Sequence, residues 1–420
     1  MAASPPPVIV IGAGIVGACV ASWLQRDGRE VMLIDPEEPG AGASSGNGGM
    51  LSGSSIVPVA MPGVAAKVPG WLMDAEGPLT IRWKYLPQML PWLWRFIRSA
   101  TPEKVEAQAR ALRALLVGSL DNYAPIVRDA GAERLVHRQG TLYLYASEAS
   151  WRNDARNTDL RRRNGVEIED LVGAALRERE PDLGPAFTHA RLVRANGHVS
   201  DPRALVQVLV SYAVARGARV LRERVVGFEE NGARVGAVLT AQARRPASHV
   251  VLACGAWSKP LAKKLGDAVP LDTERGYHIN IAQPEKGPRT PTLYVDGNFG
   301  ATPMNGGLRF TGTVELAGLA APPDWRRADL LLRQGRRLYP GLCPTDDASR
   351  ITRWLGFRPS LPDSLPVIGP STRLANAFYA FGHGHVGMCA ASTTGRMIAD
   401  LVAGRSPCVG LAPFSPARFS

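Results

Sequence analysis

Three glycines and one acid near the start of the chain have the types and the spacing that bind a nucleotide. Gly12, Gly14 and Gly17 stand close together after an apolar run, and Asp35 ends the next apolar run. Glycine permits a tight turn and lets the backbone approach a pyrophosphate, whose charge is favoured at a helix N-terminus. Asp35 can accept hydrogen bonds from a ribose diol and disfavours a 2′-phosphate. The pattern predicts a site for FAD or NAD, the alternative being a chance glycine-rich turn.

The elements that must position these residues follow from the same stretch. The β-branched run VIVIG at residues 8–12 is typical of a buried parallel strand, and residues 14–26 have the apolar spacing of a helix. The run EVMLID at residues 30–35 predicts a second strand. A strand, a glycine turn, a helix and a strand with a terminal acid together predict a Rossmann-like nucleotide-binding unit.

A loop of small residues follows the second predicted strand. Its sequence is GAGASSGNGGML, residues 40–51, and five of these residues are glycine. Such a loop can lie flat against a ring system because it carries little side-chain bulk, and its N–H groups can bond the polar edge of the ring. The loop therefore favours FAD, with a flexible linker as the alternative.

Three stretches resemble the D-amino acid oxidase/dehydrogenase (DAO) family of FAD enzymes, which includes glycine and sarcosine oxidases. Ser44, Asn47 and Gly49 match the family's Ser-x-x-Asn-x-Gly loop, which embraces the isoalloxazine. HVVLACGAWS at residues 249–258 is similar to the family strand that returns the chain to the cofactor. Residues 356–404 resemble the C-terminal flavin motif, most specifically in RPSLPDSLPVIG and GHGHVG. Within the family, the resemblance is nearest to bacterial D-amino acid dehydrogenases.

The resemblance implies noncovalent FAD, because Asn47 and Phe357 stand where the family's covalent linkages use a histidine or a cysteine. The commoner dehydrogenase loop carries alanines beside the asparagine, whereas this loop carries Gly46, Gly48 and Gly49. The predicted FAD contacts are Gly12, Ala13, Gly14, Ile15, Val16, Gly17, Asp35, Pro36, Ser44, Ser45, Asn47, Gly48, Gly49, Leu51, Val225, Ala253, Gly255, Trp257, Arg358, Gly382, His383, Gly384, His385, Val386, Gly387 and Met388.

The expected chemistry is oxidation of an α-amino acid, in which the α C–H bond gives a hydride to flavin N5 while the protein orients the substrate. A planar arginine fork suits the substrate carboxylate best. Arg358 stands where glycine oxidase-like enzymes place such an arginine, the alternative being a structural arginine before a proline. Tyr277 can give a phenol to the same carboxylate, and His385 is expected beside the flavin or the substrate. No carboxylate or cysteine with ligand spacing accompanies the histidines, so no metal is predicted.

These features predict an FAD-dependent D-amino acid dehydrogenase that yields a 2-oxo acid and ammonia. A cyclic D-imino acid such as D-proline or hydroxyproline would undergo the same chemistry and give a cyclic imine. One alternative is an oxidase of glycine or of an N-methylated amino acid such as sarcosine on the same fold. Others are a flavoprotein subunit of a larger complex and a binding protein with a vestigial nucleotide fold.

The fold class expected is α/β, with two domains. Residues 1–55, 198–270 and 351–420 should form a discontinuous Rossmann-like FAD-binding domain. Residues 56–197 and 271–350 should form a substrate domain with a mostly antiparallel sheet. Locally, Asp201 and Pro202 predict the start of a helix. Hairpins are predicted at Asn231–Gly232 and within RLVHRQGTLYLYAS, residues 134–147.

The composition bears on the cellular compartment and the partners of the protein. The 420 residues include five scattered cysteines, which suggests reduced thiols in the cytoplasm. The N-terminus lacks the basic region of a signal peptide, and no apolar run is long enough to span a membrane. The net charge is +12, but no nucleic-acid motif accompanies it. The expected partner is a small amino acid substrate, and the sequence carries no signal for an oligomeric state.

A tryptophan- and arginine-rich stretch, Trp71 to Arg98, suggests a peripheral contact with the inner face of a membrane, where quinone would accept electrons. Trp92 and Trp94 lie close to Arg95 and Arg98 in LPWLWRFIRS. Aromatic side chains favour the headgroup level, and arginines favour anionic lipid. The alternative is that the tryptophans pack into the substrate domain, since Trp92 and Trp94 fall on opposite sides of a helix.

Overall fold

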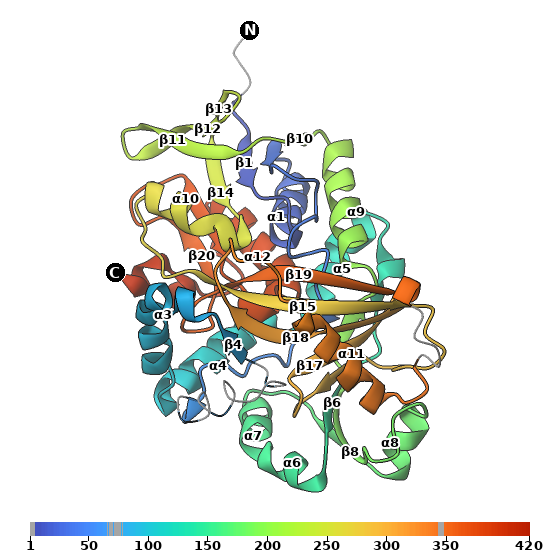
Figure 1. The fold of residues 1–420 in the computed structure, drawn as a ribbon. Helices are drawn as coiled ribbons and strands as arrows, with labels where there is room; N and C mark the ends of the chain where they lie inside the picture. The colour runs from blue at the N-terminus through green and yellow to red at the C-terminus, as the bar shows by residue number, and fades with distance from the viewer. Residues whose placement is uncertain (1–4, 65, 67–69, 71–76, 78, 343–347) are drawn as a thin grey trace.

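A computed structural model of the chain describes residues 5–64, 66, 70, 77, 79–342 and 348–420. In these residues, strands that are far apart in the sequence meet in two large sheets, with helices packed around them (Figure 1). Trp71, at the start of the tryptophan-rich stretch, lies outside the described residues. The two sheets are the frame that positions the site.

The first sheet carries the nucleotide fingerprint. Neighbouring strands are parallel except β20 and β21, which are antiparallel. Val8 and Val10 pack into one apolar cluster and Ile9 and Ile11 into another, so the strand they form is buried on both faces. This burial explains its unbroken apolar run. The strand order is β10 (Arg219–Leu221), β2 (Val31–Ile34), β1 (Val8–Ile11), β14 (His249–Leu252), β21 (Ala377–Phe381) and β20 (Val367–Pro370).

Helices and a small sheet cover the two faces of this sheet. On one face, α1 (Ile15–Arg26) contacts both α9 (Pro202–Ala215) and α12 (Gly387–Val402). Asp201 caps α9 as predicted, since its side chain accepts a hydrogen bond from the N–H of Ala204 at 3.0 Å. The other face packs against α10 (Ser258–Lys264) and a three-stranded meander of β11 (Val225–Asn231), β12 (Arg234–Thr240) and β13 (Arg244–Pro246).

The second sheet has nine strands in the described chain and is mainly antiparallel. Only the β16–β6 and β4–β18 pairs are parallel. Helix α11 (Arg326–Leu338) packs on β15 and β18 and closes an apolar cluster on that face. The order is β19 (Ile351–Ser360), β15 (Asp272–Ala282), β18 (Gly307–Leu316), β17 (Phe299–Met304), β16 (Thr292–Tyr294), β6 (Thr141–Tyr145), β8 (His189–Val193) and β7 (Glu169–Val172), with β4 (Leu79–Ile81) paired to β18.

The remaining elements connect the two sheets. A small sheet joins β3 (Met50–Leu51), β9 (Gly197–Val199) and β5 (Val136–His137). Helix α12 contacts two of the connecting helices, α4 and α5. The connecting helices are α3 (Leu86–Ser99), α4 (Pro102–Leu116), α5 (Ser119–Asp129), α6 (Glu148–Asn153), α7 (Ala155–Arg163) and α8 (Ala174–Arg179).

The predicted fold class is confirmed: a Rossmann-like sheet is combined with a mostly antiparallel one. The hairpin at Asn231–Gly232 is also present, between β11 and β12. The hairpin expected in residues 134–147 is wrong, because β5 pairs with β9 while β6 pairs with β8 and β16. The division into two discontinuous domains stays a prediction. Strand β19, grouped from the sequence with the FAD-binding segments, is hydrogen bonded to β15 in the second sheet.

Candidate active site

The turn between β1 and α1 requires glycine at two positions, Gly12 and Gly17. Gly12 has φ +108°, and a Cβ atom on it would lie 2.4 Å from the carbonyl oxygen of Ala253, which directly follows β14. A Cβ atom on Gly17 would lie 1.9 Å from the carbonyl oxygen of Gly12. The start of α1 therefore approaches β1 and β14 as closely as backbone allows, which is the packing that the fingerprint predicts.

Asp35 closes this turn at the end of β2. The N–H groups of Ala13 and Glu37 donate to its two carboxylate oxygens at 2.8 and 2.9 Å. Burial raises the pKa of Asp35, while these two N–H donors oppose the shift. The carboxylate is thus fixed in place beside the first turn of α1.

One large cavity of about 1290 Å³ joins this turn to the second sheet. Most of the predicted FAD contacts line it. Five do not: Ala13, Gly17, Ser45, Gly49 and Leu51. The predicted contacts that line the cavity are Gly12, Gly14, Ile15, Val16, Asp35, Pro36, Ser44, Asn47, Gly48, Val225, Ala253, Gly255, Trp257, Arg358, Gly382, His383, Gly384, His385, Val386, Gly387 and Met388.

The glycines of the small-residue loop are required by its neighbours on the second sheet. A Cβ atom on Gly46 would lie 2.2 Å from the ring of Trp354, and one on Gly48 would lie 2.9 Å from Oγ1 of Thr311. The departure from the commoner alanine-containing loop therefore has a steric reason. The loop lies pressed between the cavity and the sheet.

Hydrogen bonds hold this loop at both ends. Ser44 Oγ accepts a bond from the N–H of Ile15 in α1 at 2.9 Å. Arg309, on β18, donates from Nη1 to the carbonyl oxygens of Ser45 and Asn47 at 3.0 and 2.7 Å. Burial lowers the pKa of Arg309 to about 10. Arg309 was not among the predicted site residues, because no local pattern distinguishes it from the other arginines.

The GHGHVG segment lies between β21 and α12 and faces the same cavity. His383 is buried, and its Nε2 lies 3.0 Å from Oγ1 of Thr394. Burial lowers the pKa of His383 to about 3, so this imidazole is neutral at neutral pH. His385 instead exposes its side chain to the cavity and pairs with Glu274 on β15. The two histidines therefore have different surroundings although they are two residues apart.

Arg358 reaches across the second sheet into the cavity. It lies on β19, and its guanidinium covers Gly276 of β15, where a Cβ atom would lie 2.3 Å from Cζ. Its Nη1 and Nη2 donate to the carbonyl oxygens of Thr313 and Gly312 on β18, at 3.0 and 3.4 Å. Thr313 has φ +57°, a strained conformation for a β-branched residue. Strain at the residue that anchors Arg358 supports a functional position for this guanidinium.

Glu274 is the register partner of Arg358 across β15 and β19. It is 4% exposed, and its carboxylate also accepts a hydrogen bond from Ser360 Oγ at 2.5 Å. Burial alone would raise the pKa of Glu274, but His385, Ser360 and Arg358 lower it to about 2. The sequence analysis missed Glu274. No local signal was available, because β15 has the sequence DTERGYHINIA and alternates other polar residues with apolar ones.

Tyr277 is among the residues that line the cavity, although its side chain follows Gly276 on β15 and points to the face opposite Arg358. It belongs to the apolar cluster under α11, and its hydroxyl donates to Glu315 at 2.6 Å and accepts from the N–H of Asp324 at 2.9 Å. Its role as a carboxylate ligand stays a prediction that this placement does not favour. Arg275, 3.4 Å from Glu315, is buried on the same side. The alternation of side chains along a strand explains the separation.

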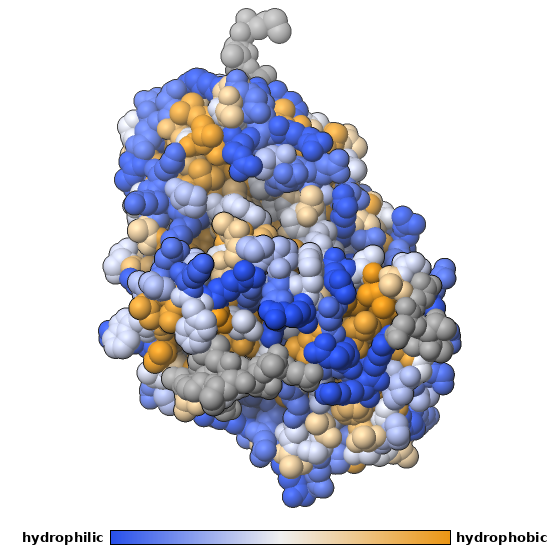
Figure 2. All heavy atoms as spheres, viewed as in Figure 1, coloured by the Kyte–Doolittle hydropathy of each residue, from blue (hydrophilic) through white to orange (hydrophobic). Residues whose placement is uncertain are grey.

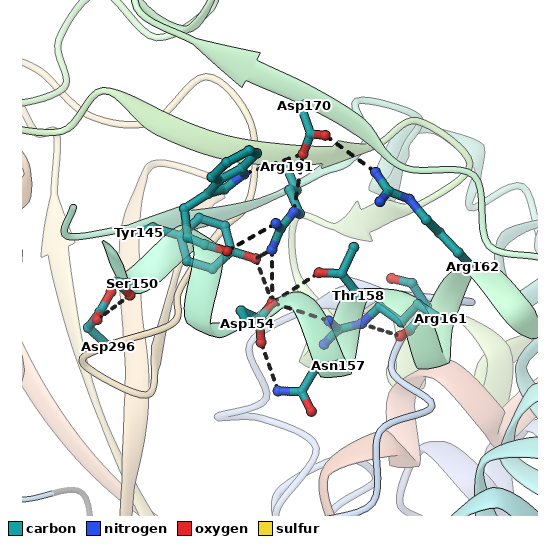
Figure 3. Close-up of polar contacts among 12 residues, drawn as sticks. Tyr145, Ser150, Asp154, Asn157, Thr158, Arg161, Arg162, Asp170, Arg191 and Asp296 are labelled. Carbon is teal, nitrogen blue, oxygen red and sulfur yellow. Dashed lines mark hydrogen bonds and ion pairs between the residues drawn. The ribbon is translucent and has the colours of Figure 1, made fainter. Parts of the chain in front are cut away.

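Figure 3 shows a polar network, three residues of which, Asp154, Asn157 and Arg161, line the cavity. Asp154 accepts hydrogen bonds from Tyr145 and Asn157, both at 2.7 Å, and lies 3.3 Å from Nη1 of Arg191. The strand of Tyr145 is five strands from that of Arg358, roughly 24 Å at about 4.8 Å per step. A small substrate held by Arg358 does not span that distance, so we interpret this network as structural.

The residues present fit FAD. The cavity exceeds the roughly 300–1,000 Å³ of pockets for drug-sized ligands, which leaves room for a dinucleotide and a small substrate. The glycine turn and the first turn of α1 would hold the pyrophosphate, and Asp35 the ribose. The loop around Asn47 and the segment from Gly382 to Met388 would hold the isoalloxazine.

Known proteins match the chain over its whole length. The family model for FAD dependent oxidoreductases (DAO) matches residues 7–401. A D-amino-acid oxidase of Bradyrhizobium diazoefficiens is 43% identical, over 98% of each protein, and a D-amino acid dehydrogenase of that species is 30% identical, over 98% of this chain and 99% of the other. The crystal structure of glycine oxidase from Geobacillus kaustophilus has the same fold, with a TM-score of 0.72 at 21% identity over 99% of each chain. The chain is an enzyme of the DAO family of FAD-dependent oxidoreductases.

Proposed function

We propose that this enzyme oxidises D-amino acids, or cyclic D-imino acids such as D-proline and hydroxyproline, at the carbon between the amine and the carboxylate. The observation that carries the proposal is the guanidinium of Arg358, fixed over Gly276 in the cavity that would hold FAD. A planar fork of N–H donors suits a carboxylate. The 43% identity to a D-amino-acid oxidase supports the D configuration.

In this proposal the protein binds and orients the substrate. Bound FAD supplies the acceptor for the hydride that leaves the α-carbon. Arg358 holds the carboxylate, and the loop around Asn47 and the GHGHVG segment exclude water from the reacting carbon. The substrate loses two electrons and becomes an imine. Water then converts the imine to a 2-oxo acid and ammonia, whereas a cyclic imino acid yields a cyclic imine.

Anaerobic bleaching of the bound flavin tests the proposal. The D enantiomers of a panel of amino acids should reduce the flavin, and the L enantiomers should not. Reduction by glycine or sarcosine alone would favour an amine oxidase like the glycine oxidase whose fold this chain shares. If no amine reduces the isolated chain, the alternative of a flavoprotein subunit that needs partners replaces the proposal.

We also propose that α3 brings the enzyme to the cytoplasmic face of an anionic membrane, where quinone takes its electrons. Within the described ranges, no helix has the length and hydropathy to cross a bilayer. Helix α3 exposes an apolar stripe, however, with Leu90 55%, Trp94 61% and Ile97 47% exposed. Figure 2 shows hydrophobic surface in the region of α3. The exposed cations Arg95 and Arg98 lie beside the stripe and would pair with anionic lipid.

The opposite side of α3 supports an apolar electron acceptor. Trp92, Leu93 and Phe96 line the cavity, and Trp92 is only 6% exposed and stacks on Phe96 at 5.2 Å. Trp92 therefore packs inside, as the alternative considered from the sequence has it, whereas Trp94 is exposed and available for the proposed contact. An apolar molecule at the exposed stripe would lie near an apolar end of the cavity.

Vesicle co-sedimentation tests the membrane contact. The protein should bind vesicles that contain anionic lipid, and binding should weaken as salt rises. The double variant Trp94→Ala, Arg95→Ala should stay in the supernatant. Leu319→Ala, which removes an apolar side chain 40% exposed outside α3, is the matched control and should bind like the unmodified protein. Equal recovery of the unmodified protein with and without vesicles would contradict the proposal.

A further inference from the structure

The imidazole of His385 and the carboxylate of Glu274 form a hydrogen-bonded pair in the cavity. His385 belongs to η5 (Gly384–Val386), and its Nε2 lies 2.7 Å from Oε2 of Glu274 on β15. The side chain of His385 is 41% exposed and lines the cavity, whereas that of Glu274 is 5% exposed. A buried carboxylate that orients an accessible imidazole is the arrangement of a general base.

The hydrogen bonds decide which nitrogen of His385 is free. An ionised carboxylate only accepts, so the proton of the shared hydrogen bond is carried by Nε2. Nδ1 then keeps its lone pair, and no described residue forms a hydrogen bond with it. Arg358 on β19 is the register partner of Glu274 on β15, and the first turn of α12 carries no acid. Glu274 thus serves as the counter-ion of both cations, Arg358 and protonated His385.

The His385–Glu274 pair and the guanidinium of Arg358 lie on the same face of β15. Glu274 and Gly276 are two residues apart on β15, roughly 7 Å, and the guanidinium of Arg358 covers Gly276. The amine and the carboxylate of an α-amino acid are bonded to the same carbon. A substrate held by Arg358 over Gly276 therefore presents its amine in the neighbourhood of His385.

We propose that His385, oriented by Glu274, takes a proton from the substrate's ammonium group before the substrate is oxidised. The inference rests on the proposed oxidation of amino acids. One N–H bond of the ammonium breaks, one N–H bond forms at Nδ1, and the substrate loses no electrons in this step. The neutral amine then has the lone pair that assists loss of the α-hydrogen, and Glu274 balances the imidazolium. The proton leaves to water when the product departs. His385 is thus a catalytic residue, and Glu274 a positioning residue.

The pH dependence of kcat/KM for anaerobic flavin reduction tests the step. His385→Asn should lower kcat/KM at neutral pH by about 10²–10⁴-fold, the usual contribution of a general base. The loss should shrink as pH rises, because an alkaline solution removes the ammonium proton without help. A loss of the same size at every pH would indicate a structural role and overturn the proposal. His189→Asn, on β8 and outside the cavity, is the matched control and should keep the profile of the unmodified enzyme.

The variant Glu274→Gln tests the positioning role of Glu274 separately from the role of His385 as a base. This variant removes the counter-ion, so the acid limb of the profile should move to lower pH by roughly 1–3 pH units. Glu103→Gln, exposed on α4, should leave the limb in place. An unmoved limb in Glu274→Gln would contradict the pairing.

The pairing of His385 with Glu274 can also be measured without turnover, by NMR, in a variant that has lost FAD. In ¹⁵N-histidine spectra, the resonance missing from His385→Asn identifies the imidazole, and its titration should move to lower pH in Glu274→Gln. Titration at the same pH in both proteins would overturn the pairing. If no amino acid reduces the flavin of the unmodified enzyme, the proposed function fails, and the spectra still report on the pair.

Discussion

Gly276→Ala tests the proposed binding of the substrate carboxylate by Arg358 most directly, because it changes no polar group. The new Cβ atom would lie 2.3 Å from Cζ of Arg358 and 2.3 and 2.4 Å from its two terminal nitrogens. Ordinary contact begins at 3.4 Å, so the guanidinium must move by about 1.1 Å, the difference of these two distances. The atoms that must move are the end of a flexible side chain, and the backbone φ of Gly276 is not in the left-handed region. The fold should therefore survive.

The displacement removes the guanidinium from the carbonyl oxygens of Thr313 and Gly312, at 3.0 and 3.4 Å. A charge-assisted contact with the substrate carboxylate is worth roughly 1.5–3 kcal/mol, which corresponds to an affinity loss of about 10- to 150-fold. Misplacement of about 1 Å at a reacting centre has a cost of similar size. Gly276→Ala should thus behave much like Arg358→Ala in substrate affinity.

Anaerobic titration of the flavin with a D-amino acid measures this affinity. FAD content and melting temperature should stay near those of the unmodified enzyme. Gly410→Ala, where a Cβ atom meets nothing within 4 Å, is the matched control. Unchanged affinity in Gly276→Ala would refute the assignment of the grip to Arg358. A comparable loss of FAD or of thermal stability would refute the reasoning that only the guanidinium moves.

Three further outcomes are expected. Acid or heat should release intact FAD, and flavin that stays on the precipitated protein would contradict noncovalent binding. Arg309→Met should weaken FAD binding by roughly 10- to 150-fold, because it removes charged donors to the carbonyl oxygens of Ser45 and Asn47; equal FAD retention on dilution would count against this role. The pKa of Glu274 is about 2 in the folded protein against 4.5 ordinarily, so its contribution of roughly 3 kcal/mol is complete above pH 4.5 and is lost as pH falls toward 2. The free energy of unfolding, measured with denaturant, should therefore change less with pH in Glu274→Gln than in the unmodified protein between pH 4.5 and 2. The same pH dependence in both proteins would disprove the coupling.

The nucleotide-binding unit could be predicted because its constraints are local. The positive φ of Gly12 and the contact between Gly17 and Gly12 arise within one turn, so the sequence has to carry glycine at both positions. The alternative of a chance glycine-rich turn is excluded by the strand, helix and strand that flank it. The hairpin in residues 134–147 failed for the opposite reason. Its first strand finds a partner, β9, that no local pattern identifies.

In the candidate site, too, local motifs could be predicted from the sequence and long-range contacts could not. Arg358 was found through a motif, but its surroundings were not. Glu274 and Tyr277 both line the cavity, but the register of β15 with β19 pairs Glu274 with Arg358, whereas the ring of Tyr277 packs in the apolar cluster under α11. From the sequence, Tyr277 was predicted to give a phenol to the substrate carboxylate, and Glu274 was not predicted.

The sequence by itself determined the cofactor, the family and the local elements that hold the nucleotide, because glycine geometry, apolar periodicity and motif spacing act over short segments. Only the tertiary structure decided which side chains meet in the cavity. His385 and Glu274 are separated by 111 residues, and Arg309 reaches a loop 262 residues away. Such contacts follow from strand register and from the packing of one sheet against another, and these are properties of the whole chain.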